Sequence, residues 1–259
     1  MKRLLSRSSV VATLLASLSL VAGVTVALLS GVAGEQSSTF TSGDVSIGST
    51  ASTVCNLRAG GVAPSAALLP GDSSTGWTPS PGIDQPCTLK VTYTGANPAY
   101  LGIDLLIATK SGSVASGAPA GTTPTPLFDA TANGLQLRVT DSANTVFVNG
   151  TTFTSQGAGA GSSTISSVPC ASPYNISAYS CYQVNDLLVN PTAVTNGFSD
   201  TFSIDYSLPL SSTSAYENST AVVIMNVHAV QSNNNPLPAG PPSAVCQAGA
   251  QCSTGLQWN

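Results

Sequence analysis

Residues 201–208, Thr-Phe-Ser-Ile-Asp-Tyr-Ser-Leu, decide the fold class. Large apolar side chains stand at every second position, at Phe202, Ile204, Tyr206 and Leu208, and polar side chains stand between them. Side chains of a β-strand alternate between the two faces of a sheet, so this period of two predicts a strand with one buried face. A helix would instead repeat its apolar residues every three or four positions.

The same alternation recurs along the chain and predicts strands at Cys87–Tyr93, Leu101–Ile107 and Leu135–Val139. The stretch Ala221–Val230 is apolar on both faces at its start and predicts a central strand. Weaker strands are predicted at Thr39–Ile47, Val54–Leu57, Thr145–Val148 and Asp186–Val189. Stretches rich in Gly, Pro or Ser, at 78–82, 116–126 and 156–163, provide turns. About eight or nine short strands predict an all-β fold, a single jelly-roll-like antiparallel β-sandwich.

The N-terminus has the order of segments that is typical of a secretory signal peptide. Lys2, Arg3 and Arg7 form a basic head, and the uncharged apolar run Val10–Leu29 follows. Small residues then permit cleavage after Ala33. An uncleaved membrane anchor is the alternative, because about twenty apolar residues can span a bilayer.

The layout predicted along the chain has four parts. Residues 1–34 are the signal peptide, 35–48 an N-terminal strand that could be donated to a neighbour, 49–232 the β-sandwich, and 233–259 an irregular tail. Without the leader, four basic residues face eleven acidic ones, and charged residues make up only 7% of the chain. So few cations argue against binding to nucleic acid, or to a membrane once the leader is cleaved.

Six cysteines follow the leader, and an even number in an exported chain predicts disulfides. They allow many alternative pairings. Short loops favour the local pairs Cys170–Cys181 and Cys246–Cys252, which leaves Cys55 with Cys87. A zinc site is the rival explanation, but the chain has no Cys-x-x-Cys and its one histidine is distant from the cysteines in sequence.

Three segments carry a family resemblance. They are Ser38–Ile47 after the leader, the turn Leu69-Pro70-Gly71-Asp72-Ser73 ahead of two alternating strands, and Val222–Asn233, which contains Ala-Val-Gln before Ser-Asn. In this order they resemble the TasA/camelysin family of secreted biofilm-matrix fibre proteins, which includes archaeal bundling-pilus relatives. The six cysteines, the few charges and residues 111–185 depart from the family pattern.

The resemblance implies a jelly-roll domain that polymerises outside the cell with other copies of itself. In such a family, the N-terminal strand of one subunit completes the sheet of the next, because an open sheet edge offers unpaired backbone donors and acceptors. The residues of this chain that match the donated strand are Phe40, Val45 and Ile47. Head-to-tail contacts of this kind do not close, so they produce filaments. Other matrix components are further partners that the resemblance allows.

No catalytic, cofactor-binding or metal-binding residue is predicted. The lone His228 falls in a strand, on the face that it shares with Val222, Ile224 and Val230, which favours a structural role. The camelysin branch carries a metallopeptidase label, but its zinc signature needs two histidines. The acidic residues are scattered, and Asp200 with Asp205 is the pair closest in sequence, so no cofactor is expected.

Asn149, Asn175 and Asn218 each begin an Asn-x-Ser/Thr sequon and are candidate glycosylation sites in a host that modifies exported proteins. The first hypothesis for function is a non-enzymatic, extracellular or cell-surface subunit that self-assembles into filaments by exchange of its N-terminal strand. A monomeric secreted jelly-roll binding module or adhesin is the alternative. A secreted peptidase is the third hypothesis, which the single histidine argues against.

Overall fold

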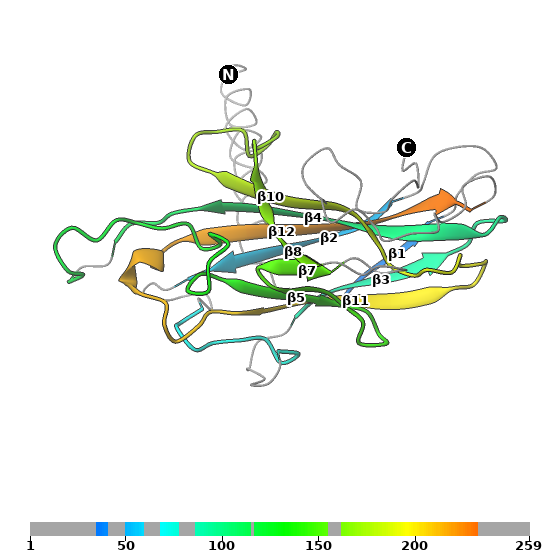
Figure 1. Ribbon diagram of the computed structural model, residues 1–259, viewed down its shortest axis with the longest axis horizontal. Helices are drawn as coiled ribbons and strands as arrows, with labels where there is room; N and C mark the ends of the chain where they lie inside the picture. The colour runs from blue at the N-terminus through cyan, green and yellow to red at the C-terminus, as the bar shows by residue number, and fades with distance from the viewer. Residues whose placement is uncertain are drawn as a thin grey trace, which may run out of the picture. The chain divides into compact units, whose positions relative to one another are not determined.

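The alternating stretches form strands with buried inward side chains in the computed structural model (Figure 1). The structure describes residues 35–40, 50–59, 68–77, 86–114, 117–154 and 162–232. All of these residues belong to one unit, Ala33–Asn259. Within them the only helix is a single 3-10 turn, η1 (Ser214–Tyr216). The predicted leader and tail lie outside the described residues.

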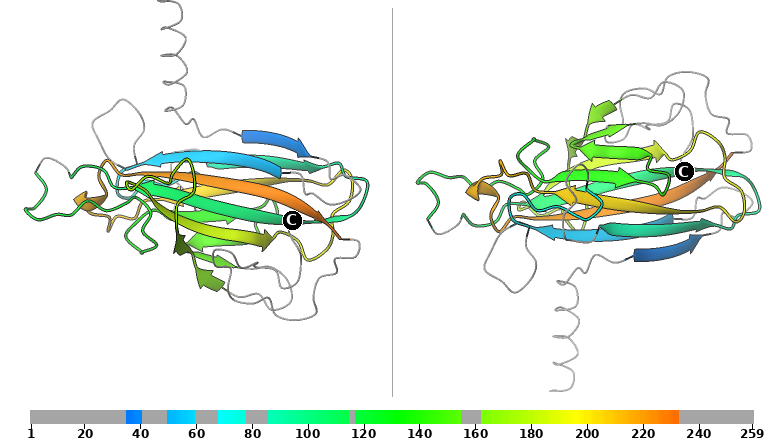
Figure 2. Two further views of the ribbon diagram at one scale, coloured as in Figure 1. Left: turned by 90° about the horizontal axis from the view of Figure 1, so that it is seen from above. Right: turned by 90° about the horizontal axis from the view of Figure 1, so that it is seen from below.

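The strands form two sheets (Figures 1 and 2). The seven-stranded sheet has the order β1 (Glu35–Phe40), β3 (Cys87–Tyr93), β11 (Ser199–Ser207), β5 (Gln136–Thr140), β6 (Val146–Gly150), β7 (Thr152–Thr154) and β8 (Ser162–Thr164). The five-stranded sheet has the order β2 (Thr50–Arg58), β12 (Thr220–Gln231), β4 (Ala99–Lys110), β10 (Ser180–Leu188) and β9 (Ser166–Val168). All paired strands are antiparallel except β1, which runs parallel to β3.

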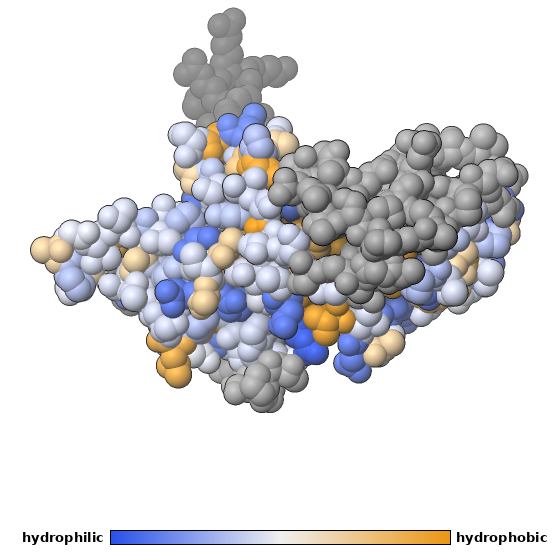
Figure 3. All heavy atoms as spheres, viewed as in Figure 1, coloured by the Kyte–Doolittle hydropathy of each residue, from blue (hydrophilic) through white to orange (hydrophobic). Residues whose placement is uncertain are grey.

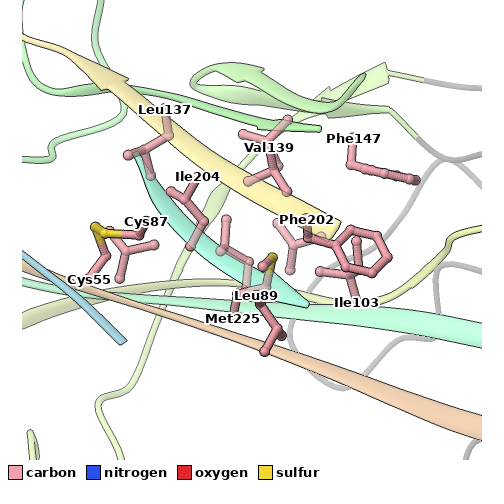
Figure 4. Packing of buried hydrophobic residues seen from close by; sticks show 14 of the residues in the cluster. Cys55, Cys87, Leu89, Ile103, Leu137, Val139, Phe147, Phe202, Ile204 and Met225 are labelled. Carbon is pink, nitrogen blue, oxygen red and sulfur yellow. A yellow bond between two sulfur atoms is a disulfide. The ribbon is translucent and has the colours of Figure 1, made fainter. Parts of the chain in front are cut away.

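One core lies between the sheets, and Figure 4 shows side chains from both of them meeting there. Phe202 and Ile204 of β11 are fully buried, and they belong to the same cluster as Ile103 of β4 and Met225 of β12. The inward residues of β12 are buried without a break, at Ala221, Val223, Met225, Val227 and Ala229. The predicted β-sandwich is therefore confirmed, with β12 as a central strand between β2 and β4.

Two of the predicted disulfides are present. Cys55 of β2 is bonded to Cys87 of β3, so this bond joins the two sheets, and both of its cysteines are buried (Figure 4). Cys170 is bonded to Cys181 and closes the loop between β9 and β10. The third predicted pair, Cys246–Cys252, lies outside the described residues.

Several strands differ from their predicted bounds. The predicted strand at 54–57 is the centre of the longer β2, and the one at 186–189 overlaps only the end of β10. The short strands β7, β8 and β9 were not predicted. They consist of Ser and Thr with one Phe and one Val, so they lack the apolar alternation that would indicate them.

The Pro-Gly-Asp turn belongs to a segment, Leu68–Trp77, that packs along the end of β11. Gly71 adopts φ +99°, and its N–H donates to the Leu208 carbonyl at 2.7 Å. The Ser74 hydroxyl donates to the Asp205 carboxylate at 2.8 Å and accepts from the Tyr206 N–H at 3.1 Å. Asp205 is only 3% exposed, so the bond from Ser74 satisfies a carboxylate oxygen that would otherwise be costly to bury.

The adjacent leucines of β4 test the assignment of its two faces. Leu105 is 1% exposed in the core, whereas Leu106 is only partly buried on the outer face. We expect Leu105→Ala to lower the free energy of unfolding by about 2–5 kcal/mol, because it leaves a cavity. The matched Leu106→Ala should cost less than about 1 kcal/mol. Denaturant titration with the disulfides intact measures both, and equal losses would contradict the assignment.

Candidate assembly edge

The N-terminal strand β1 forms one edge of the seven-stranded sheet. Its six residues pair with β3 in a regular parallel register, from Glu35 opposite Thr88 to Phe40 opposite Tyr93. Among the described strands, β3 is the only one to which β1 is hydrogen-bonded. A parallel pair is slightly less stable per residue than an antiparallel one, and all other pairs here are antiparallel. Within the described part of the chain, β1 is therefore held in the sheet by a single ladder of backbone hydrogen bonds.

Strand β3, by contrast, is fixed from three directions. Leu89, Val91 and Tyr93 are completely buried on its inward face. On the side away from β1, it pairs with β11 over six residues. Cys87 at its start is bonded to β2 of the opposite sheet. If β1 left, β3 would keep these contacts and would present a row of backbone N–H and C=O groups as a new sheet edge.

The residues predicted for strand donation fall in different places. Phe40 is the last residue of β1 and lies opposite Tyr93. Val45 and Ile47 lie between 41 and 49, outside the described residues. The strand begins at Glu35, the first residue of the predicted N-terminal strand 35–48 and four residues before Thr39, where the apolar alternation begins. The polar residues Glu35 to Thr39 show no apolar alternation, so their place directly after the predicted cleavage site is the signal that includes them in the strand.

The other sheet has an edge strand on the same side. β2 is the first strand of the five-stranded sheet, and its disulfide to β3 places it beside the edge that carries β1. Its outward residues Ser52, Asn56 and Arg58 are exposed, and Val54 between them is 51% exposed. At its end, the Leu68 N–H donates to the Arg58 carbonyl at 2.8 Å.

His228 lies on β12 and points away from the core, on the predicted face. Its Nδ1 is 3.3 Å from the Asp104 carboxylate on the adjacent strand β4, a cross-strand contact that fits a structural role. No group of three or more His, Cys, Asp or Glu side chains that could hold a metal ion occurs in the described part of the chain. The same residues contain no helix long and apolar enough to cross a membrane.

Asp200 and Asp205, the carboxylates closest in sequence, do not form one site. Their odd spacing along β11 places them on opposite faces of the sheet. Asp200 accepts from the backbone N–H groups of Ser142 and Thr201, and Asp205 is bonded to Ser74. Each carboxylate therefore serves as a local acceptor.

The three sequons differ in environment. Asn149 and Asn175 are exposed. Asn218 is partly buried at φ +57°; its Oδ1 accepts from Arg58 at 3.3 Å and its Nδ2 donates to the Ser113 carbonyl at 3.2 Å. A glycan on the Nδ2 of Asn218 would compete with the Ser113 bond. The geometry therefore favours modification at Asn149 and Asn175.

No family model matches the chain, and no curated protein or solved structure matches it. Its function has to be inferred from its own residues and from the geometry of its two sheets.

The difference in environment between Asn218 and Asn149 can be tested by measuring how much each side chain contributes to the stability of the fold. Asn218→Ala removes both side-chain hydrogen bonds. It also places alanine at a positive φ, which alanine adopts less readily than asparagine. We therefore expect the free energy of unfolding to fall by about 1–3 kcal/mol. The matched Asn149→Ala should change it by less than about 0.5 kcal/mol, because the side chain is exposed. Thermal or denaturant unfolding of both variants is the measurement. Similar values for the two would show that Asn218 has no structural role.

Proposed function

We propose that the chain is an extracellular structural subunit that assembles into surface or biofilm-matrix filaments by donating β1 to the next copy. The observation that carries the proposal is the position of β1, an N-terminal strand at a sheet edge that is hydrogen-bonded to β3 alone among the described strands. The resemblance to the TasA/camelysin family supports the same assembly.

The energetics of exchange support this role. A β1 strand from a neighbour can make the same six-residue ladder with β3 that the chain's own β1 makes. The hydrogen bonds lost in one copy are regained in another, so exchange of an identical element has a low net cost. The acceptor stays folded meanwhile, because β3 remains attached to β11 and β2. Subunit concentration then decides between the closed monomer and the filament.

The length of the segment between β1 and β2 limits how far β1 can extend to a neighbouring copy. Residues 41–49 separate β1 from β2. Fully extended, a segment of this length spans at most about 30 Å. Each copy would donate its strand to one neighbour and accept a strand from another. Such heterologous contacts form open filaments rather than closed dimers.

Composition and disulfides support an extracellular location. The two disulfides fit an oxidising environment. The signal-peptide pattern of residues 1–34 adds export. On the face seen in Figure 3, the described residues are mostly pale, which means intermediate hydropathy, and charged residues are only 7% of the chain. Weak charge gives little repulsion between copies that pack closely.

Deletion of Gly34–Ile47 tests the proposal directly. The leader-free wild-type chain should form filaments in negative-stain microscopy and in light scattering as its concentration rises. The deleted chain should stay monomeric, with both disulfides and its cooperative unfolding retained, because β3 is held by other contacts. Filaments of unchanged thickness and rate from the deleted chain would refute strand donation.

A mixing experiment separates exchange from pairing within one chain. The register places Thr39 opposite Thr92. One preparation carries Thr39→Cys and a second carries Thr92→Cys, and the two are mixed and oxidised under conditions that keep the native disulfides. Exchange should produce a covalent heterodimer, which pairing within one chain cannot produce. Thr39→Cys mixed with Thr152→Cys, on the distant strand β7, is the control.

A further inference from the structure

The loop between β9 and β10 is constrained by a disulfide and by backbone hydrogen bonds. It stands out from the sandwich beyond the start of β10 (Figure 1). The Cys170–Cys181 disulfide closes it, and β9 pairs with β10 at its base, with Val168 opposite Cys181. Inside the loop, the Tyr174 N–H donates to the Ala171 carbonyl at 2.8 Å, and the Tyr179 N–H donates to the Ile176 carbonyl at 3.1 Å. These constraints keep the loop in shape before any ligand arrives.

The loop borders an open cleft of about 570 Å³, a volume within the range of small-ligand sites. Apolar surface comes from Val168 and Ile176, and Ile176 is 57% exposed. Hydrogen-bonding side chains come from the exposed residues Ser167, Asn175, Ser177 and Ser180. None of the described residues that line the cleft is charged.

Two tyrosines, Tyr179 and Tyr182, are among the residues that line the cleft. Tyr179 lines it and contacts the Tyr174 ring edge to face, with centroids 5.3 Å apart. The Lys110 ammonium lies 5.6 Å from the centroid of the Tyr179 ring and helps to hold it. Tyr182 also lines the cleft, and its ring packs on the core residue Phe128 with centroids 5.0 Å apart. Burial raises the pKa of Tyr174 and of Tyr182, so both phenols stay neutral at ordinary pH.

We propose that this cleft binds a neutral saccharide. A sugar ring presents C–H groups that pack on aromatic and apolar side chains, and hydroxyls that exchange hydrogen bonds with Ser, Asn and Tyr. The cleft supplies both kinds of group from a rigid loop. The described lining residues carry no charge, and the nearby cation Lys110 is engaged with the Tyr179 ring, which matches a neutral ligand better than a carboxylated sugar that would have to give up its hydration.

The saccharide has two possible sources. It can be a separate polysaccharide, or it can be an N-linked glycan on Asn175, which lines the cleft and begins a sequon. Asn175→Gln removes the sequon and keeps an amide. If the chain's own glycan fills the cleft, Asn175→Gln made in a glycosylating host should bind added polysaccharide more tightly than the wild type from that host. If the ligand is a separate polysaccharide, the two should bind equally.

Affinity electrophoresis of the leader-free chain, made in a host without N-glycosylation, tests the proposal. The probes are dextran, mannan and a soluble glucan, with alginate as the anionic comparison. At least one neutral polysaccharide should retard the wild-type chain, with the same affinity from about pH 5 to pH 8, because no carboxylate, imidazole or amine is among the described residues that line the cleft. Retardation by alginate alone, or by none of the probes, overturns the proposal.

Substitutions of tyrosines test whether the saccharide binds in the cleft. Tyr179→Ala should weaken it about tenfold because a stacking surface is lost, whereas Tyr179→Phe keeps the ring and should retain most of the affinity. Tyr100→Ala is the matched control, because Tyr100 is a partly buried tyrosine at the far end of β4 from Lys110. Equal binding by Tyr179→Ala and the wild type places the saccharide elsewhere and overturns the proposal. The cleft is separate from β1, so this result and that of the Gly34–Ile47 deletion are independent.

Discussion

The disulfide between Cys55 and Cys87 is the covalent constraint that ties the two sheets to each other. It joins β2 to β3 across the sandwich, on the side where β1 also lies. Cross-linking residues 32 positions apart lowers the entropy of the unfolded chain and stabilises the fold by roughly 3–4 kcal/mol in the loop-entropy model. It also anchors β3, the strand that would become an edge without β1. Among the described strands, the side of the molecule that carries the one parallel ladder is therefore also the side with a covalent link between the sheets.

The sequence predicted the fold where side chains alternate strongly. Phe202, Ile204 and Tyr206 indicated a half-buried strand, and all three face the core. It could not predict the order of the strands, because pairing partners such as β12 and β4 are far apart in the chain and no local pattern records their register. The bond between Ser74 and Asp205 was missed for the same reason, since 131 positions separate the two residues.

The candidate sites were predictable to different degrees. Phe40 lay in a predicted strand, but the parallel pairing of β1 with β3 was not predicted, because the chain between them gives no sign of a crossover. The cleft was missed altogether. Tyr174, Tyr179 and Tyr182 follow neither a helical nor a strand period, and the cleft depends on how the loop folds back under its disulfide. The signal that was available was the concentration of tyrosines within and beside the short Cys170–Cys181 loop.

Strand order separates the two proposed activities in space. β2 and β9 are opposite edges of the five-stranded sheet, and the disulfide to β3 places β2 on the side of the exchange edge. The cleft, built on β9 and β10, therefore lies toward the opposite edge. A neighbour that adds its strand to β3 would approach from the side away from the cleft. Every subunit of a filament built in this way would keep its cleft open, so weak binding by single subunits would be multiplied along a polymer that contacts one polysaccharide at many points.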